Sequence, residues 1–330
     1  MRSVGILGVG HYVPERVVTN ADIVAMGLDT SDEWIVERTG IRERRLCAPD
    51  QATSDLAFEA AKNALADARV SPEEIDLVIV ATTTQDYLGF PSVACLLQHR
   101  LGLRQIGAFD LAAACTGFNY ALSVGVQFVR TRFANKVLVV GADCLSKYVD
   151  WSDRSICVLF GDGAGAVVLG EVSEGLGVLT SDLHADGSKA DLLMVKGCGS
   201  RDRVNHEVIK NEDNYMNMNG KAVFKVAIHC VVPCVLNALS KVNLKPDDLD
   251  FLVPHQANVR IIDQAREKLS LPWERVVVNL DRYGNTSAAS IPIALSEAKQ
   301  AGRFQSGQLL GLVGFGAGFT WGANLVRWGT

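Results

Sequence analysis

Apolar runs and amphipathic stretches alternate along the chain. Residues 76–83, 108–111 and 136–141 form short apolar runs rich in β-branched side chains, as expected of strands buried on both faces. Between these runs, 53–68 and 116–130 have the length and composition of helices. Because strands that alternate with helices favour a mostly parallel sheet, the pattern predicts an α/β fold.

Two of the expected helices have an unusual distribution of apolar residues. The segment 116–130 has almost no polar face, and a helix that is apolar all round is buried on all sides. The segment 287–300 begins with small and apolar residues and contains Pro292, which a helix tolerates near its start. Two such helices, each buried between sheets, predict a layered sandwich.

Two patterns in the first half of the chain recur in the second half. Residues 64–80 and 239–253 both contain a helix end, a proline followed by paired acids, and an acid that opens an apolar strand. Residues 160–169 and 315–326 both contain a glycine-rich turn that leads into a strand. Chance is the alternative, but the shared order favours a duplication, with an N-terminal half at 1–174 and a C-terminal half at 175–330.

The composition narrows the classes of function. The chain has 330 residues, of which 48% are hydrophobic and 21% charged, and its net charge is −5. This balance does not suggest a general role in binding nucleic acid or anionic membranes. No uninterrupted apolar run reaches the roughly 18 residues of a membrane span, and the N-terminus reads as a first strand rather than an export signal. Eight scattered cysteines then predict reduced thiols and a cytoplasmic protein.

Three residues that could do chemistry lie at expected strand-to-helix junctions. Cys115 precedes the buried helix at 116–130, where the helix N-terminus lowers the pKa of a thiol. His255 follows an apolar strand, and Asn285 lies between an expected strand at 276–280 and the second buried helix. Each has a structural alternative, as a buried thiol, a core histidine or a helix cap. Their common position in a duplicated fold favours a shared site.

The glycine-rich runs and the clustered cysteines do not suggest a bound nucleotide or metal. Residues 161–165 and 313–318 lead into strands, so neither is a dinucleotide fingerprint or a phosphate loop. Gly316 instead allows close approach of the backbone, whose N–H could face an oxyanion. His229, Cys230 and Cys234 lack a second pair of ligands and lie among apolar residues, so we expect no metal site.

At these positions the sequence resembles a known family. The motifs around Cys115 (112–118), His255 (254–258) and Asn285 (284–290) are similar to those of β-ketoacyl-acyl-carrier-protein synthase III. Residues 29–41, 161–165 and 318–322 match as well, and the resemblance runs essentially from end to end.

The resemblance implies a thiolase-like five-layer αβαβα sandwich that works as a homodimer. Cys115 would take the acyl group from an acyl-coenzyme A primer, with acetyl-coenzyme A the expected one. His255 and Asn285 would stabilise the enolate formed when malonyl-acyl carrier protein loses carbon dioxide, and the backbone N–H groups of Cys115 and Gly316 would form an oxyanion hole. Such an acyltransferase initiates fatty acid biosynthesis and needs no redox or metal cofactor.

The resemblance also implies binding residues. Trp34 and Arg38 would line the mouth of the coenzyme A channel. The structural alternative for Trp34 is an aromatic residue of the core. The remaining expected channel residues are Thr30, Arg154, Gly220, Asn258 and Arg260. The acyl pocket would include Phe160, Met216 and Phe90, with Phe90 reaching into the partner subunit. On the expected helix 259–269, Arg260, Arg266 and Lys268 would form a landing site for the acidic carrier protein, or simply a solvated charged face.

Other functions use related residue sets. Papain-like cysteine peptidases have Cys, His and Asn in the same chain order, but their signature around the cysteine is absent here. A non-catalytic scaffold is a second alternative. Within the family, relatives prime polyketides, assemble alkylquinolones or transfer acyl groups to oxygen, and these are the runner-up functions.

Overall fold

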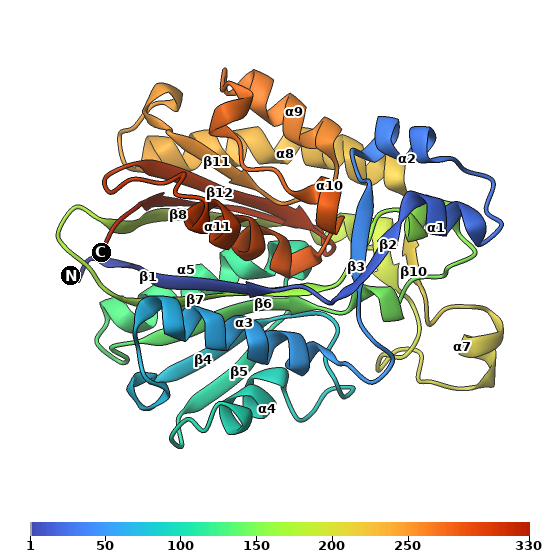
Figure 1. Ribbon diagram of the computed structural model, residues 1–330, viewed down its shortest axis with the longest axis horizontal. Coiled ribbons are helices and arrows are strands. Elements are labelled where there is room, and N and C mark those ends of the chain that lie inside the picture. The colour runs from blue at the N-terminus through green and yellow to red at the C-terminus, as the bar shows by residue number, and fades with distance from the viewer. Residues whose placement is uncertain (1) are drawn as a thin grey trace.

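Two β-sheets form the framework of the protein. The computed structural model describes residues 2–330. The first sheet has the strand order β1-β7-β6-β4-β5, and the second has the order β11-β12-β13-β8. Figure 1 shows that helices lie outside each sheet and between the two sheets, which gives five layers. The predicted αβαβα sandwich is therefore confirmed.

The first half of the chain contains the first sheet, its helices and a small outer ribbon. Its elements are β1 (Val4–Tyr12), β2 (Arg16–Thr19), α1 (Asn20–Ala25), α2 (Asp32–Thr39), β3 (Glu43–Leu46), α3 (Thr53–Ala68), β4 (Leu77–Ala81), α4 (Val93–Arg100), β5 (Gly107–Leu111), α5 (Gly117–Arg130), β6 (Val137–Asp143), α6 (Arg154–Cys157) and β7 (Gly163–Glu171). The helix predicted at 53–68 has these bounds in the structure, and the strands predicted at 76–83, 108–111 and 136–141 correspond to β4, β5 and β6.

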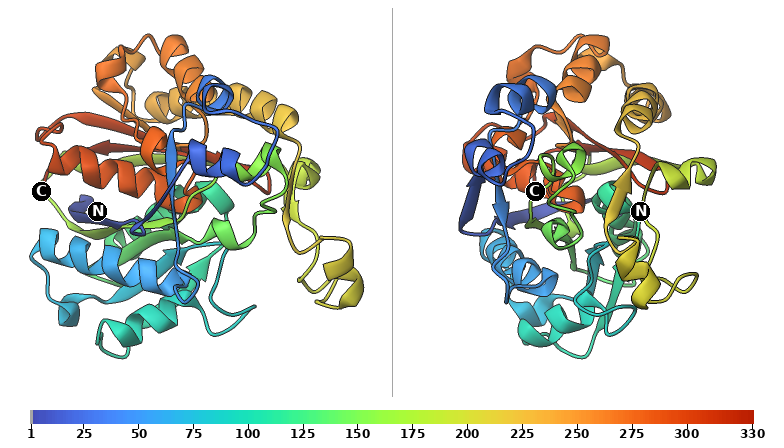
Figure 2. Two further views of the ribbon diagram at one scale, coloured as in Figure 1. Left: turned by 45° about the vertical axis from the view of Figure 1, so that its right-hand side comes forward. Right: turned by 90° about the vertical axis from the view of Figure 1, so that its right-hand side faces the viewer.

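The second half contains the second sheet and its helices. Its elements are β8 (Gly177–Ala185), β9 (Leu193–Val195), α7 (His206–Lys210), β10 (Met216–Met218), α8 (Gly220–Lys241), β11 (Phe251–Pro254), α9 (Val259–Lys268), α10 (Leu280–Tyr283), α11 (Ser290–Gln300), β12 (Leu309–Gly316) and β13 (Thr320–Arg327). The small β9–β10 pair lies against the side of the sandwich, and α7 extends away from it, as Figure 2 shows.

The central layer consists of α5 and α11, which pack between the sheets (Figure 1). Phe118 and Leu122 of α5 and Ile291 and Leu295 of α11 are fully buried there. In α5 only Gln127 is exposed, which agrees with its nearly continuous apolar sequence. The outer faces of the two sheets are covered by α3 and α4 on one side and by α8 and α9 on the other.

The two sheets are built in the same order. In each sheet the first strand along the chain pairs antiparallel with the last, the last pairs antiparallel with the strand just before it in the chain, and that strand pairs parallel with the second. A parallel bridge between Leu252 and Val276 occupies the place that β5 has in the first sheet. The predicted boundary at 174/175 falls in the connection between β7 and β8 and stays a prediction.

The strand predicted at 276–280 is wrong. The Val277 N–H donates to the Leu252 carbonyl of β11. A strand would continue this ladder two residues later, but the Asn279 N–H donates instead to the side chain of Gln256. The chain then turns into α10 at Leu280. The apolar residues here are buried beside a strand without forming a ladder, a distinction that hydrophobicity alone does not make.

Helix α8 differs from the expectation that no segment resembles a membrane span. Its length of 22 residues and a mean hydropathy of 1.9 over 18 residues would suit one. In the structure its apolar residues pack on the second sheet and against α9, as those of an outer-layer helix do. The expectation of no membrane partner stays a prediction.

Candidate active site

Cys115 lies where β5 passes into the central helix α5. It is the middle residue of a single 3₁₀ turn, and the preceding Ala114 has a φ of 46°, a value that side chains other than glycine rarely adopt. Cys115 is buried, and burial raises the pKa of its thiol to about 12, while a hydrogen bond from the Ser287 hydroxyl lowers it. The N-terminus of α5 also favours the thiolate. The turn therefore holds the sulfur at the end of the helix that stabilises its reactive form.

The end of β12 lies directly against this turn. A Cβ atom placed on Gly316 would lie 2.7 Å from the Cys115 backbone nitrogen and 2.9 Å from its Cβ, closer than real Cβ contacts. Only glycine therefore lets the two backbones meet here. This is the arrangement expected if both backbone N–H groups face one oxyanion.

His255 follows the end of β11 and is held by both its backbone and its ring. Its N–H donates to the Val313 carbonyl at 2.7 Å, and its Nδ1 lies 2.7 Å from the Ser290 hydroxyl. Phe315 packs edge-on against the ring. Burial lowers the pKa of His255 to about 3, so the imidazole is neutral at physiological pH. A neutral ring is suited to donate or accept one hydrogen bond rather than to carry charge.

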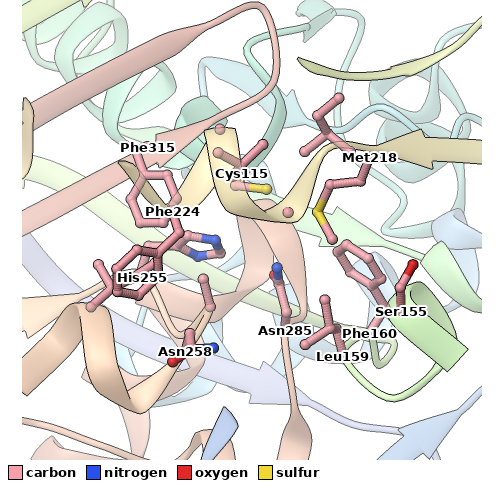
Figure 3. A pocket seen from close by; sticks show the side chains of 16 residues that line it. Cys115, Ser155, Leu159, Phe160, Met218, Phe224, His255, Asn258, Asn285 and Phe315 are labelled. Atoms are coloured by element: carbon pink, nitrogen blue, oxygen red, sulfur yellow. The ribbon is translucent and has the colours of Figure 1, made fainter. Parts of the chain in front are cut away.

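Asn285 comes from the loop that precedes the second central helix. A parallel bridge to Phe160 fixes its backbone, with its N–H donating to the Leu159 carbonyl at 2.8 Å. Its side-chain Oδ1 accepts the Ser287 N–H at 2.9 Å, which leaves the amide N–H groups free to face the site. In Figure 3 the side chains of Cys115, His255 and Asn285 converge on one space. The structure thus brings together the three residues that the sequence singled out.

Cys115 lies between two cavities. The catalytic cavity, of about 170 Å³, contains His255 and Asn285 beside the cysteine. The distal cavity, of about 350 Å³, lies on the other side of Cys115 and has apolar walls that include Leu145, Met194 and Met216. Phe160 lines both cavities. The smaller cavity, which contains the three reactive side chains, can hold a reacting head group, and the larger apolar cavity can hold an acyl chain.

The expected coenzyme A residues surround the entrance to the catalytic cavity. Gly220 and Asn258 line it, and the Asn258 amide donates to the Arg38 carbonyl. Trp34 is half-buried, with the Arg38 and Arg154 guanidinium groups 5.0 and 5.2 Å from its ring centre. A flat aromatic ring with cations beside it suits a nucleotide base and its phosphates.

Two further expected channel residues lie near this group. The Thr30 hydroxyl is buried and has no hydrogen-bond partner among the described residues. Arg260 is exposed at the start of α9, and its guanidinium lies 5.7 Å from the ring centre of Phe224, a residue of the cavity wall.

The expected carrier-docking residues differ in whether their charge is already balanced by a neighbour. Arg266 makes an ion pair with Asp263 at 2.6 Å and lies over the ring of Trp273, so its charge is already balanced. Arg260 and Lys268 are exposed on α9. Sequence reasoning missed Lys221 and Lys225, which are exposed on α8 and one helical turn apart, a spacing that could have revealed a common face.

The expected acyl-pocket residues also differ in position. Phe160 and Met216 line the distal cavity, whereas Phe90 does not, since its side chain is 85% exposed on the loop after β4. Tyr87 and Leu88 on the same loop are exposed as well. Phe90 therefore makes no contribution to the cavity of its own chain.

Three polar residues around the site were not singled out from the sequence. Ser287 and Ser290 lie three residues apart in the motif that contains Asn285, a spacing that places them on one side of a helix start. Asp143, at the end of β6, is fully buried and accepts hydrogen bonds at Oδ1 from Thr82, Thr83 and Thr84. Burial raises the pKa of Asp143, and these donors oppose that rise.

One group of side chains outside the site has a geometry that could suit a metal. Asp182, His184 and Cys234 have ligand atoms within 4.8 Å of one another. The Asp182 carboxylate, however, already pairs with the Lys241 ammonium at 2.6 Å and with His184 at 2.8 Å. His229 and Cys230, which the sequence placed beside Cys234, do not belong to this group. The expectation of no metal stays a prediction.

Comparisons with known proteins agree with the site. The family model "3-Oxoacyl-[acyl-carrier-protein (ACP)] synthase III" matches residues 109–187, and the model of its C-terminal part matches residues 239–328. A relative from Xanthomonas campestris pv. campestris, a beta-ketoacyl-[acyl-carrier-protein] synthase III, is 53% identical over 98% of both chains.

Solved structures give the same result. The synthase III of Thermus thermophilus is 52% identical and has a TM-score of 0.91, with 98% of this chain and 99% of that one covered. The synthase III of Pseudomonas aeruginosa PAO1 is 43% identical and has a TM-score of 0.92, with 100% of this chain and 99% of that one covered.

Proposed function

The chain belongs to the β-ketoacyl-acyl-carrier-protein synthase III family, and from this premise we propose how its residues carry out the reaction. The enzyme is an acyltransferase that condenses an acyl-coenzyme A primer with malonyl-acyl carrier protein. The products are a 3-oxoacyl-acyl carrier protein, carbon dioxide and coenzyme A, and the reaction initiates fatty acid biosynthesis. The observation that carries this function is the position of Cys115 between the two cavities, with His255 and Asn285 in one of them.

In the first half-reaction, the Cys115 sulfur attacks the thioester carbon of the primer. The carbon–sulfur bond to coenzyme A breaks, the proton lost by the Cys115 thiol balances the one gained by the leaving sulfur, so coenzyme A leaves as a thiol, and the acyl group stays on Cys115. Oxygen carries negative charge in the tetrahedral intermediate, and the backbone N–H groups of Cys115 and Gly316 are the proposed donors to it. The acyl chain then extends into the distal cavity past Phe160 and Met216.

In the second half-reaction, malonyl-acyl carrier protein enters the catalytic cavity. Its terminal carbon–carbon bond breaks, carbon dioxide leaves, and the electron pair passes to the thioester as an enolate. The neutral imidazole of His255 and the amide of Asn285 donate hydrogen bonds to the enolate oxygen. The enolate carbon attacks the carbonyl carbon of the acyl-cysteine, and the new carbon–carbon bond forms. The carbon–sulfur bond to Cys115 then breaks, and the released thiolate takes up a proton from solvent. Because two neutral donors in a buried site can stabilise the enolate, the proposal requires no cofactor.

Coenzyme A would lie in the channel with its base against Trp34 and its phosphates near Arg38, Arg154 and Arg260. The support for this placement is that the Arg38 and Arg154 guanidinium groups lie beside the half-buried ring of Trp34. Arg260 lies beside Phe224, a residue of the cavity wall. Arg260 and Lys268, together with Lys221 and Lys225, would meet the acidic carrier protein.

We propose that the enzyme acts as a cytoplasmic homodimer. The support is the loop that carries Tyr87, Leu88 and Phe90, whose large apolar side chains are exposed, and the unpaired edge of β5 beside it. In a dimer, Phe90 would enter the distal cavity of the partner and limit its depth, which suits a short primer such as acetyl-coenzyme A.

Intact-protein mass spectrometry tests the proposed function. The wild-type enzyme and Cys115→Ser are mixed with acetyl-, isobutyryl- or octanoyl-coenzyme A, and malonyl-acyl carrier protein is added afterwards. We expect a stable acyl adduct on the wild type alone, discharged by the malonyl substrate, with acetyl transferred fastest. The absence of an adduct with every primer would refute Cys115 as the nucleophile.

A further inference from the structure

The imidazole of His255 has one side-chain hydrogen-bond partner among the described residues. Its Nδ1 lies 2.7 Å from the hydroxyl oxygen of Ser290, the first residue of α11. Both residues are buried, with exposed fractions of 3% for His255 and 1% for Ser290. The ring nitrogen on the opposite side, Nε2, has no protein partner in the described chain, and the ring borders the catalytic cavity.

The proton in this hydrogen bond can be assigned by asking which arrangement satisfies both groups. In the described chain the Ser290 hydroxyl makes no hydrogen bond other than that to His255. If Nδ1 carried the proton and donated it to the serine oxygen, the hydroxyl hydrogen would be buried without an acceptor, which is costly. If Ser290 donates instead, both groups are satisfied. Nδ1 is then the acceptor, and a neutral imidazole must carry its proton on Nε2.

We propose that Ser290 is a positioning residue that holds His255 in the tautomer with the proton on Nε2, so that the ring donates a hydrogen bond to the thioester oxygen of the malonyl substrate. The inference rests on the proposed function, because it concerns the decarboxylation half-reaction. Ser290 itself does not contact the substrate in this scheme. It determines which nitrogen of the ring bears the hydrogen.

The tautomer matters because His255 is neutral and has only one ring proton. In the opposite tautomer, Nε2 would present a lone pair to the enolate oxygen, and the interaction would be repulsive when charge develops there. Asn285 is fixed in a comparable way, because its Oδ1 accepts the Ser287 N–H and its amide N–H groups are left for the site. The start of the second central helix thus orients both donors.

The same helix contains a matched control. The hydroxyl of Ser296 lies 2.9 Å from Nδ1 of His11, and Ser296 is fully buried. Its removal therefore deletes a serine–histidine hydrogen bond from α11 outside the two cavities that meet at Cys115. Ser296→Ala should show what the loss of such a bond does to folding alone.

The first test compares both half-reactions in Ser290→Ala, Ser290→Thr and Ser296→Ala. Decarboxylation of malonyl-acyl carrier protein is measured by release of carbon dioxide, and acylation of Cys115 by mass spectrometry. We expect Ser290→Ala to lose about 10- to 100-fold in decarboxylation, by analogy with the loss typical when the partner that orients a metal-bound histidine is removed. Acylation should stay near the wild-type rate, Ser290→Thr should recover most of the loss, and Ser296→Ala should change neither rate. A loss no larger than that of Ser296→Ala, or an equal loss in both half-reactions, overturns the proposal.

The second test observes the tautomer directly. Nitrogen-15 NMR of wild-type enzyme labelled at histidine, with the His255 signals identified by their absence in His255→Gln, reports which ring nitrogen carries the proton. We expect the proton on Nε2 in the wild type and in Ser290→Thr. A proton on Nδ1 in the wild type overturns the inference. A wild type that decarboxylates no malonyl substrate would instead refute the proposed function, and the NMR result would still decide the tautomer.

Discussion

Replacing Gly316 by alanine tests whether its backbone contact with Cys115 serves acyl transfer. The backbone of Gly316 has no positive φ, so alanine can adopt its conformation, and only the space for a methyl group is lacking. The new Cβ would lie 2.7 Å from the Cys115 nitrogen, whereas ordinary contacts begin at 3.4 Å, so one backbone must move by about 0.7 Å.

A displacement of this size is enough to remove a hydrogen bond. A donor at about 2.9 Å from an oxyanion would move to about 3.6 Å, a distance that no longer counts as a hydrogen bond. Loss of one donor to an oxyanion costs about 10²–10³ in rate. We therefore expect Gly316→Ala to slow the acylation of Cys115 by that factor.

Time-resolved mass spectrometry of acetyl-enzyme formation measures this rate. Gly314→Ala on the same strand is the control, because its nearest contact, to the Asn119 Oδ1, is 3.1 Å and involves no atom of the proposed oxyanion hole. If Gly316→Ala remains folded and acylates within about fivefold of the wild type, the backbone of Gly316 does not form part of the oxyanion hole, and the expected factor of 10²–10³ is refuted.

Three further predictions concern binding and stability. Trp34→Ala should raise KM for the acyl-coenzyme A about 10-fold, since stacking on a base contributes about 1–3 kcal/mol, with little change in kcat; Trp273→Ala, which removes a surface tryptophan that also has an arginine over its ring, should not change KM. Arg260→Glu should raise KM for malonyl-acyl carrier protein, and Arg266→Glu should raise it less because Asp263 already balances the charge of Arg266. Equal increases in KM would show that the pairing with Asp263 does not keep Arg266 from contributing to carrier-protein docking. Burial lowers the pKa of folded His255 to about 3 from its ordinary value of 6.5, so below about pH 6.5 the unfolded chain takes up a proton that the folded chain does not. This group should therefore lower the free energy of unfolding by about 1.4 kcal/mol per pH unit as the pH falls from 6 to 4. Urea unfolding at several pH values should show that the free energy of unfolding of His255→Gln falls less steeply with pH. Equal slopes for the wild type and the variant would count against the burial of a neutral ring.

The parts of the fold that local sequence determines were predictable. Buried strands such as β4 and β6 have apolar runs rich in β-branched residues, and α5 is mostly apolar because both of its sides contact a sheet. Its polar Asn119 and Ser123 are buried and donate hydrogen bonds to Asn324 and Ser181 of the second sheet. The strand predicted at 276–280 failed because its residues are equally apolar, while the hydrogen bond from the Asn279 N–H goes to a side chain. Periodicity reports burial, and it does not report where each N–H finds its acceptor.

The same distinction applies to the site. The motifs identify Cys115, His255 and Asn285 by their combination and by their resemblance to the motifs of a known family, since each residue alone also has a structural alternative. Ser290 was missed because serine at a helix start is common, and its meaning comes from a contact with a residue 35 positions away. The balanced charge of Arg266 and the two cavities around Cys115 likewise depend on packing between distant segments.

The duplicated architecture has a consequence for how the activity could be divided. The cysteine comes from one half of the chain, and the histidine and asparagine come from the other, so neither half holds a complete set of reactive groups. At the position equivalent to Cys115, the second half has Ala288, which is also the middle residue of a 3₁₀ turn and also follows a residue with positive φ, Ser287. The turn in the first half carries the nucleophilic cysteine, and the equivalent turn in the second half does not. A chain opened between β7 and β8 would give two separately inert fragments, and thioester turnover would then be a signal of their reassembly.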